Sequence, residues 1–103
     1  MPICMTARYR VRPHFVEECK RVIRELVEYV NSHEPGTTLY LAQQDILDPM
    51  SFQHLLIFEN EAALAAHQQS PASARFVQAV YPEAIKPLEF NEYDLFAAKL
   101  PKA

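Results

Sequence analysis

Glycine is almost absent from this sequence, since Gly36 is the only one in 103 residues. A phosphate-binding loop of the kind that holds flavin or nicotinamide dinucleotides needs several glycines close together. Gly36 also follows a proline at the predicted end of a helix rather than a strand. The sequence therefore excludes dinucleotide binding of the familiar loop type.

Cysteine is scarce as well, with Cys4 and Cys19 as the two examples. The periodicity described below places Cys4 on a strand and Cys19 on a helix, so we expect two free thiols, as in a reducing compartment. Neither has a second cysteine two to four residues away, and the four histidines show no ligand spacing such as His-x-x-x-His. We therefore expect no metal site.

Long apolar runs are also missing. The longest cover residues 62–66 and 55–58, far below the roughly 18 residues of a membrane span. The first residues lack the basic and apolar regions of a secretory signal. We therefore expect a cytoplasmic protein with no membrane partner.

Positive charge is in deficit, because ten Lys and Arg residues face thirteen Asp and Glu residues and the formal net charge is -3. Nucleic-acid binding requires clustered cations, so a nucleic-acid partner is disfavoured. What the chain does have is a globular composition, with half of its residues hydrophobic. Its length predicts a single domain over residues 1–103.

Eight prolines mark most of the element boundaries along the chain. Residues 3–12 alternate in polarity, which predicts a strand that Pro13 ends. Apolar residues then follow at helical spacing and predict a long amphipathic helix that ends before Pro35. Residues 37–46 and 52–59 are predicted strands, joined by a turn at Asp48-Pro49 into a hairpin.

The second half begins with Asn60, a good N-cap for a short helix that runs to about Gln69. Ser70-Pro71 is a second cap and first-turn signal, so we expect a helical region kinked at Pro71. Residues 88–97 predict a last strand. The order βαββαβ predicts an α+β, ferredoxin-like fold: a four-stranded antiparallel sheet with helices on one face.

Both faces of the predicted hairpin are apolar. One carries Tyr40, Ala42, His54, Leu56 and Phe58, and the other carries Leu39, Leu41, Leu55 and Ile57. A sheet with one face in water alternates cleanly between apolar and polar residues. The four aliphatic residues are better explained as an interface, so we predict a homodimer closed through this sheet face.

A row of arginines, Arg8, Arg10 and Arg12, lies at strand spacing on the same face as these aliphatic residues. Such a row can hold a phosphate or a carboxylate. Three adjacent buried cations would be costly if unpaired, so we expect pairing at the interface. The candidate carboxylates are Asp45, Glu59, Glu89 and Glu92.

Several pieces of the chain resemble one family. These are Glu34-Pro35-Gly36 before a strand with Tyr40, Asp48-Pro49 before Phe52, the run over residues 58–67, and Ser70-Pro71 before Phe76. In order and spacing they resemble the antibiotic biosynthesis monooxygenase domain of the dimeric α/β-barrel superfamily, which includes quinol monooxygenases. The resemblance covers nearly the whole chain, and it implies the ferredoxin-like fold and the homodimer.

The chain also departs from this family. Phe58 replaces a usual tryptophan, and Ala72-Ser73 stand where a histidine is usual. Haem-degrading relatives use an asparagine and a histidine at positions that correspond to Ala7 and Val80. Haem degradation by that pair is therefore not expected.

Two histidines are candidate catalytic residues, with His54 the first choice for the base and His67 the second. His54 interrupts an apolar strand face, where a neutral imidazole could take a proton from a phenolic substrate. The alternative is a core histidine bonded to a backbone carbonyl or a tyrosine. His67 matches an Ala-His pair of the family, although it could instead interact with the last carbonyls of its helix. Asp94 is a weaker candidate for orienting a histidine.

Aromatic residues offer walls for a flat ligand, or simply a core. The candidates are Tyr9, Tyr40, Phe58, Phe76 and Phe96. The resemblance implies a monooxygenase that binds a small electron-rich aromatic substrate and oxygen without a cofactor. Two alternatives stay open: an isomerase of a phosphorylated sugar-like signal molecule, with an arginine at the phosphate, and a non-catalytic, dimeric ligand-binding or stress-associated protein.

Overall fold

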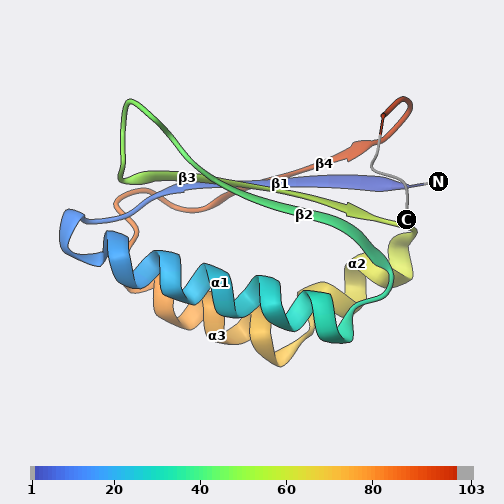
Figure 1. The fold of residues 1–103 in the computed structure, drawn as a ribbon, viewed down its shortest axis with the longest axis horizontal. Helices are drawn as coiled ribbons and strands as arrows, with labels where there is room; N and C mark the ends of the chain where they lie inside the picture. The colour runs from blue at the N-terminus through green and yellow to red at the C-terminus, as the bar shows by residue number, and fades with distance from the viewer. Residues whose placement is uncertain (1, 100–103) are drawn as a thin grey trace.

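A four-stranded sheet carries all the helices on one of its faces in the computed structural model, which describes residues 2–99 (Figure 1). The elements are β1 (Ile3–Arg10), the 3-10 turn η1 (Pro13–Phe15), α1 (Val16–His33), β2 (Thr37–Gln44), β3 (Ser51–Phe58), α2 (Glu61–Gln68), α3 (Pro71–Val80), the 3-10 turn η2 (Tyr81–Glu83) and β4 (Glu89–Asp94). This order confirms the predicted ferredoxin-like α+β fold. None of the helices in the described range is long and apolar enough to cross a membrane.

The strands lie in the order β2-β3-β1-β4, and all neighbours are antiparallel. β1 and β3 are therefore the central strands. Residues directly opposite each other in an antiparallel pair point to the same face. The register puts His54 of β3 between Ala7 of β1 and Ala42 of β2.

The predicted helix starts are confirmed at both caps. The side chain of Asn60 accepts a hydrogen bond from the backbone N–H of Ala63 at 2.9 Å, and that of Ser70 accepts one from Ser73 at 3.0 Å. These bonds satisfy amides that a helix leaves free at its N-terminus. The expected kink is a complete break into α2 and α3, because Ser70 has extended backbone angles that end one helix before Pro71 begins the next.

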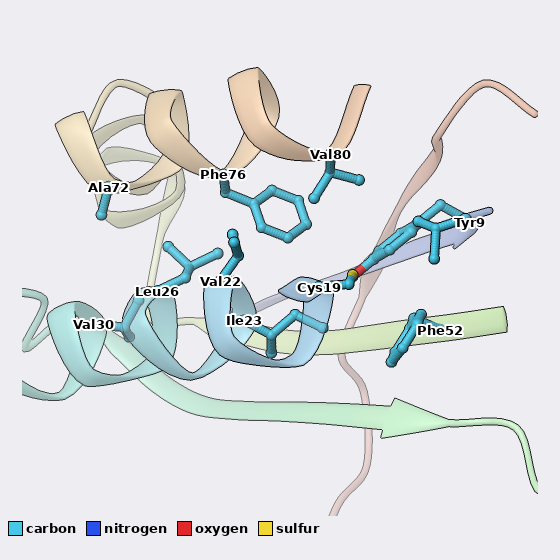
Figure 2. Close-up of a cluster of buried hydrophobic side chains, with 11 residues drawn as sticks. Tyr9, Cys19, Val22, Ile23, Leu26, Val30, Phe52, Ala72, Phe76 and Val80 are labelled. Atoms are coloured by element: carbon cyan, nitrogen blue, oxygen red, sulfur yellow. The ribbon is translucent and has the colours of Figure 1, made fainter. Parts of the chain in front are cut away.

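The main core lies between the sheet and the helices α1 and α3 (Figure 2). Its buried members are Tyr9, Val11, Cys19, Val22, Ile23, Leu26, Val30, Phe52, Ala72, Phe76 and Val80. A smaller cluster of Met5, Leu56, Phe58 and Leu64 packs under α2. The face of the sheet that these side chains cover is called the inner face below, and the opposite face is called the outer face.

The aliphatic residues of the outer face are not equally exposed. Leu41 is 46% exposed, whereas Ile57 is 5% exposed within a single chain. Ile57 lies on the central strand β3, between Cys4 and Leu39 on the neighbouring strands. The expectation of a uniformly exposed patch is therefore wrong at Ile57, because cross-strand neighbours shield a central position more than an edge position.

The expected partners of the arginine row are also corrected. Arg10 pairs with Asp48 at 2.8 Å rather than with any of the four carboxylates proposed from the sequence. The β2–β3 turn brings Asp48 beside the end of β1, where Arg10 lies opposite Ser51. Arg12 donates to the carbonyl of Pro82 at 2.9 Å. These two arginines are therefore held within the chain.

Candidate functional site

His54 occupies the middle of the inner face and is 2% exposed. Its neighbours in the register, Ala7 and Ala42, have the smallest side chains that a strand offers besides glycine. The imidazole therefore has room to reach across both neighbouring strands. Ala7 is buried, whereas Ala42, on the edge strand β2, is exposed.

Each ring nitrogen of His54 lies within hydrogen-bond distance of a different tyrosine hydroxyl. The hydroxyl of Tyr9 lies 2.6 Å from Nε2, and that of Tyr40 lies 2.6 Å from Nδ1. A neutral imidazole has one donor and one acceptor nitrogen, so one tyrosine donates to the ring and the other accepts from it. The thiol of Cys19 donates to the Tyr9 oxygen at 3.9 Å, and Figure 2 shows the two side chains meeting. We call Cys19, Tyr9, His54 and Tyr40 the His54 chain.

Burial keeps the His54 chain uncharged at neutral pH. It lowers the pKa of His54 to about 4, with a smaller contribution from the nearby His67. Burial also raises the pKa of Tyr9, that of Tyr40, and that of Cys19, the last to about 11. A low-dielectric environment disfavours the charged form of each group. The chain is therefore a network of neutral hydrogen bonds.

Three of the predicted wall residues gather around His54. Tyr9 and Phe76 contact the imidazole, with ring centroids 5.3 and 5.5 Å away, and Tyr40 does so at 5.6 Å. Phe58 instead contacts His67, at 5.5 Å. Phe96 is 93% exposed, so its expected place in the wall is wrong; it lies beyond the end of β4, outside the sheet.

His67 belongs to a second polar centre, which we call the Glu34–His67 pair. Nδ1 of His67 lies 2.8 Å from Oε1 of Glu34, and the two side chains are 7% and 8% exposed. The hydroxyl of Thr37 donates to the same oxygen at 2.9 Å. The other carboxylate oxygen, Oε2, is buried and has no hydrogen-bond partner among residues 2–99.

Sequence reasoning missed Glu34 as a functional residue. Asp94, the carboxylate proposed to orient a histidine, lies exposed on β4. Glu34 directly follows α1, where its backbone N–H donates to Val30. The available signal was the Glu34-Pro35-Gly36 motif, which marks a chain reversal between a helix and a strand without revealing what the side chain contacts.

Gly36 explains how Glu34 reaches His67. A Cβ at this position would lie 2.7 Å from the Cβ of Ala63, which is shorter than any real contact between such atoms. Only glycine therefore lets the start of β2 approach the first turns of α2 this closely. The backbone N–H of Glu59 donates to the carbonyl of Gly36 at 2.9 Å and closes the same corner.

The family of the chain follows from comparison with known proteins. A family model described as antibiotic biosynthesis monooxygenase (ABM) matches residues 2–79. The chain belongs to this family. ABM membership supports a monooxygenase at the level of the family, without indicating a substrate.

Relatives of the chain agree with the ABM assignment. An uncharacterised protein of Synechocystis, sll1783, is 30% identical over 94 residues, which cover 91% of this chain and 63% of that protein. A crystal structure of an antibiotic biosynthesis monooxygenase matches with a TM-score of 0.84 and 22% identity, over 92% of this chain and 99% of the other. A candidate antibiotic biosynthesis monooxygenase of Caulobacter crescentus matches with a TM-score of 0.87 and 20% identity, over 93% and 91%. At these identities the structural matches show the fold alone.

Two of the hollows on the surface of this ABM chain, as formed by residues 2–99, are lined by neither His54 nor His67. One, of about 630 Å³, lies at one end of the outer face and includes Arg8, Arg10, Lys86 and Glu89. The other, of about 590 Å³, lies near Asn60 and Tyr93. The arginines that a sugar-phosphate isomerase would need thus lie on the face opposite the histidines. His54 itself is buried, with the rings of Tyr9, Tyr40 and Phe76 around it.

Proposed function

We propose that this protein is a monooxygenase that acts on a small electron-rich aromatic molecule, with the substrate itself as the reductant and no bound cofactor. ABM membership supports the reaction class. The hydrogen bonding of His54 supports the class of substrate. The residues proposed for the site are His54 and His67 at the reacting hydroxyl, with Tyr9, Tyr40, Phe58 and Phe76 as aromatic walls.

The observation that carries the proposal is that His54 already forms a hydrogen bond with the phenolic hydroxyl of a tyrosine of the same chain. The hydroxyl of Tyr40 lies 2.6 Å from Nδ1, in an environment of aromatic rings. A phenolic substrate would make the same hydrogen bond, because its hydroxyl and ring match those of tyrosine. The apolar surroundings also exclude water, which protects reactive oxygen intermediates during the reaction.

The proposed reaction balances without a redox cofactor. A quinol and one molecule of oxygen give a hydroxylated quinone and one molecule of water. The quinol supplies the electrons that reduce the second oxygen atom. The protein has to bind the substrate, accept a proton from its hydroxyl and keep water out.

Access to His54 is proposed from the edge of the sheet at β2. Tyr40 is half-buried on this edge strand, and Ala42, which lies opposite His54, is exposed. Rotation of the Tyr40 side chain would open Nδ1 to a substrate entering beside Ala42. An edge strand offers this route because no further strand covers it.

Oxygen uptake by chelator-treated protein tests the proposal. We expect uptake with members of a panel of quinols and anthrones, one oxygen molecule per substrate, and none with the corresponding methyl ethers, which lack the acidic hydroxyl. Ala42→Phe, which narrows the proposed entrance, should raise KM more than it lowers kcat. Binding of the aromatic compounds without any oxygen uptake would favour a ligand-binding protein instead.

A further inference from the structure

The two histidines of the inner face differ in how many of their nitrogens are engaged. His54 has both bonded to tyrosines. His67 has Nδ1 bonded to Glu34, and Nε2 has no hydrogen-bond partner among the described residues. Tyr40 contacts both rings, with centroids 5.6 Å from His54 and 6.2 Å from His67, so the two centres adjoin.

We propose that Glu34 is a positioning residue that holds the proton of His67 on Nδ1, so that Nε2 keeps its lone pair and His67, rather than His54, accepts the proton of the substrate hydroxyl. The role of His67 as the base rests on the proposed function. The tautomer of His67 that Glu34 imposes does not depend on that function.

The tautomer follows from the chemistry of the contact. An ionised carboxylate only accepts hydrogen bonds, so the approach of Glu34 Oε1 to 2.8 Å requires a proton on Nδ1. Thr37 donates its hydroxyl to the same oxygen and thereby fixes the carboxylate in place. Phe58 packs against the ring, with the two centroids 5.5 Å apart. A neutral imidazole with Nδ1 protonated has its acceptor at Nε2.

Glu34 also lies where its carboxylate can stabilise the imidazolium that forms once the proton arrives. The titratable groups that face His67 are Glu34 at the end of α1, Tyr40 on β2 and His54 on β3. Glu34 is the one carboxylate among them, and its Oε2 has no donor among residues 2–99. An imidazolium formed 2.8 Å away would compensate this buried charge, which is the arrangement that stabilises a developing charge during catalysis.

His54 lacks such a partner. Both of its hydrogen bonds go to neutral phenols, and burial opposes its charged form. In the proposed step the O–H bond of the substrate breaks, its electron pair stays on the substrate oxygen, and an N–H bond forms at Nε2 of His67. The proton later passes to the oxygen atom that leaves as water. His54 meanwhile holds the aromatic substrate by a neutral hydrogen bond.

Nitrogen NMR of protein labelled with ¹⁵N-histidine tests the tautomer without any turnover. The signals of His67 are identified by their loss in His67→Gln. In the wild type we expect the neutral form of the ring to carry its proton on Nδ1. In Glu34→Gln the amide can donate to Nδ1, so the form protonated on Nε2 should appear. Glu28→Gln is the matched control: it makes the same change at an exposed carboxylate of α1 and should leave the tautomer unchanged.

Steady-state kinetics of the same variants test whether His67 is the base. His67→Gln should lower kcat by about 100-fold or more, as expected for loss of a general base. Glu34→Gln should lower kcat at least about 10-fold and leave KM unchanged, because Glu34 does not touch the substrate. Glu28→Gln should stay within about twofold of the wild type. If Glu34→Gln does not fold, Glu34→Asp, which keeps the charge but withdraws it by one methylene, provides the comparison.

Each result decides part of the proposal. A wild-type His67 whose neutral form is protonated on Nε2 overturns it. So does a normal kcat in His67→Gln. An absence of oxygen uptake by the wild type overturns the proposed function and the role of the base with it, while the NMR result still decides what Glu34 does to His67.

Discussion

The inner and outer faces of the sheet arise from the same alternation of residues along the strands. The helices of the chain cover the inner face, whereas the outer face lies on the side of the sheet without helices (Figure 1). On β1, Tyr9 points into the core while Arg8 and Arg10 point outward. On β3, His54 is enclosed and fully hydrogen-bonded. On the outer face, Leu41 stays largely exposed beside a broad hollow lined by charged and amide side chains.

This difference suggests that the two faces serve different functions. Polar groups in the core lose their hydration and are retained at a cost in stability unless they are paired. The inner face nevertheless contains two histidines, two tyrosines and a carboxylate, which suits chemistry better than packing. The outer face keeps aliphatic side chains partly in water, which suits a contact with a second copy of the chain. The homodimer through this face remains a prediction.

The largest effect is expected from a charge placed on the outer face at its most buried position. Ile57→Asp should destabilise the chain by about 4 kcal/mol or more, because the carboxylate would be buried between Cys4 and Leu39 without a partner. Urea unfolding, or recovery only as insoluble protein, would measure this. A variant with wild-type stability would show that the outer face is as open at its centre as at its edge.

The matched substitution at the edge separates folding from assembly. Leu41→Asp puts the same charge on an exposed position, so the chain should fold while a homodimer through this face dissociates. Light scattering should give a dimer mass for the wild type and a monomer mass for the variant. Leu47→Asp, in the exposed turn between β2 and β3, is the control and should leave the mass unchanged. A monomeric wild type would contradict the proposed interface.

The contrast between Ile57 and Leu41 also shows where sequence reasoning ends. Alternation correctly assigned both residues to the outer face, and the caps at Asn60 and Ser70 were predicted because they depend on contacts within a few residues. How far a neighbour shields a side chain depends on strand order, which brings together segments far apart in the chain. The partner of Arg10 was missed for the same reason, since the turn that carries Asp48 is placed by the hairpin as a whole.

A large effect on the inner face is expected from acid. The pKa of His54 falls from 6.5 to about 4 in the folded protein because burial opposes its charge. Between these values the unfolded chain binds the proton and the folded chain does not. Stability should therefore be complete above about pH 6.5 and decrease by about 3 kcal/mol as the pH falls to 4.

Urea unfolding across this pH range, in the wild type and in His54→Gln, provides the measurement. The variant should lose most of the pH dependence, whereas His33→Gln, which removes an exposed histidine, should keep it. The carboxyl of Asp48, whose pKa Arg10 and Ser51 lower from 3.8 to about 2, acts at lower pH and does not interfere. A pH dependence that persists in His54→Gln would place its origin at another group.

A smaller effect is expected at the corner between β2 and α2, where Gly36 lets Glu34 reach His67. Gly36→Ala would bring a Cβ to within 2.7 Å of the Cβ of Ala63 and 3.3 Å of Oε1 of Glu59. Overpacking of this kind costs about 1 to 3 kcal/mol. Adding Ala63→Gly to the variant should restore part of the loss in a double-mutant cycle. Purely additive effects would mean that β2 and α2 do not press on each other at this point.

The candidate site was predictable in part, for the same physical reason as the fold. The strand period placed His54 on the inner face, and a tyrosine was among the partners expected for a core histidine. The pairing of Glu34 with His67 was not predictable, because 33 residues separate them and only the packing of β2 against α2 brings them together. A sequence pattern indicates which face a side chain occupies, whereas hydrogen-bond partners depend on the tertiary fold.

The smallest effect concerns the two thiols, one on each side of the sheet. The structure gives both as free, in agreement with the sequence prediction. Cys19 is fully buried on the inner face and its pKa is raised to about 11, whereas Cys4 is half-buried. Because the thiolate is the reactive form and needs access to the reagent, Cys4 should react with Ellman's reagent in the native protein and Cys19 only after unfolding. Modification of Cys4 in the native protein should change the melting temperature by no more than about 2 °C. Equal rates for the two thiols under native conditions would show that the inner face opens as readily as the outer one, and that the His54 chain is accessible without a movement of Tyr40.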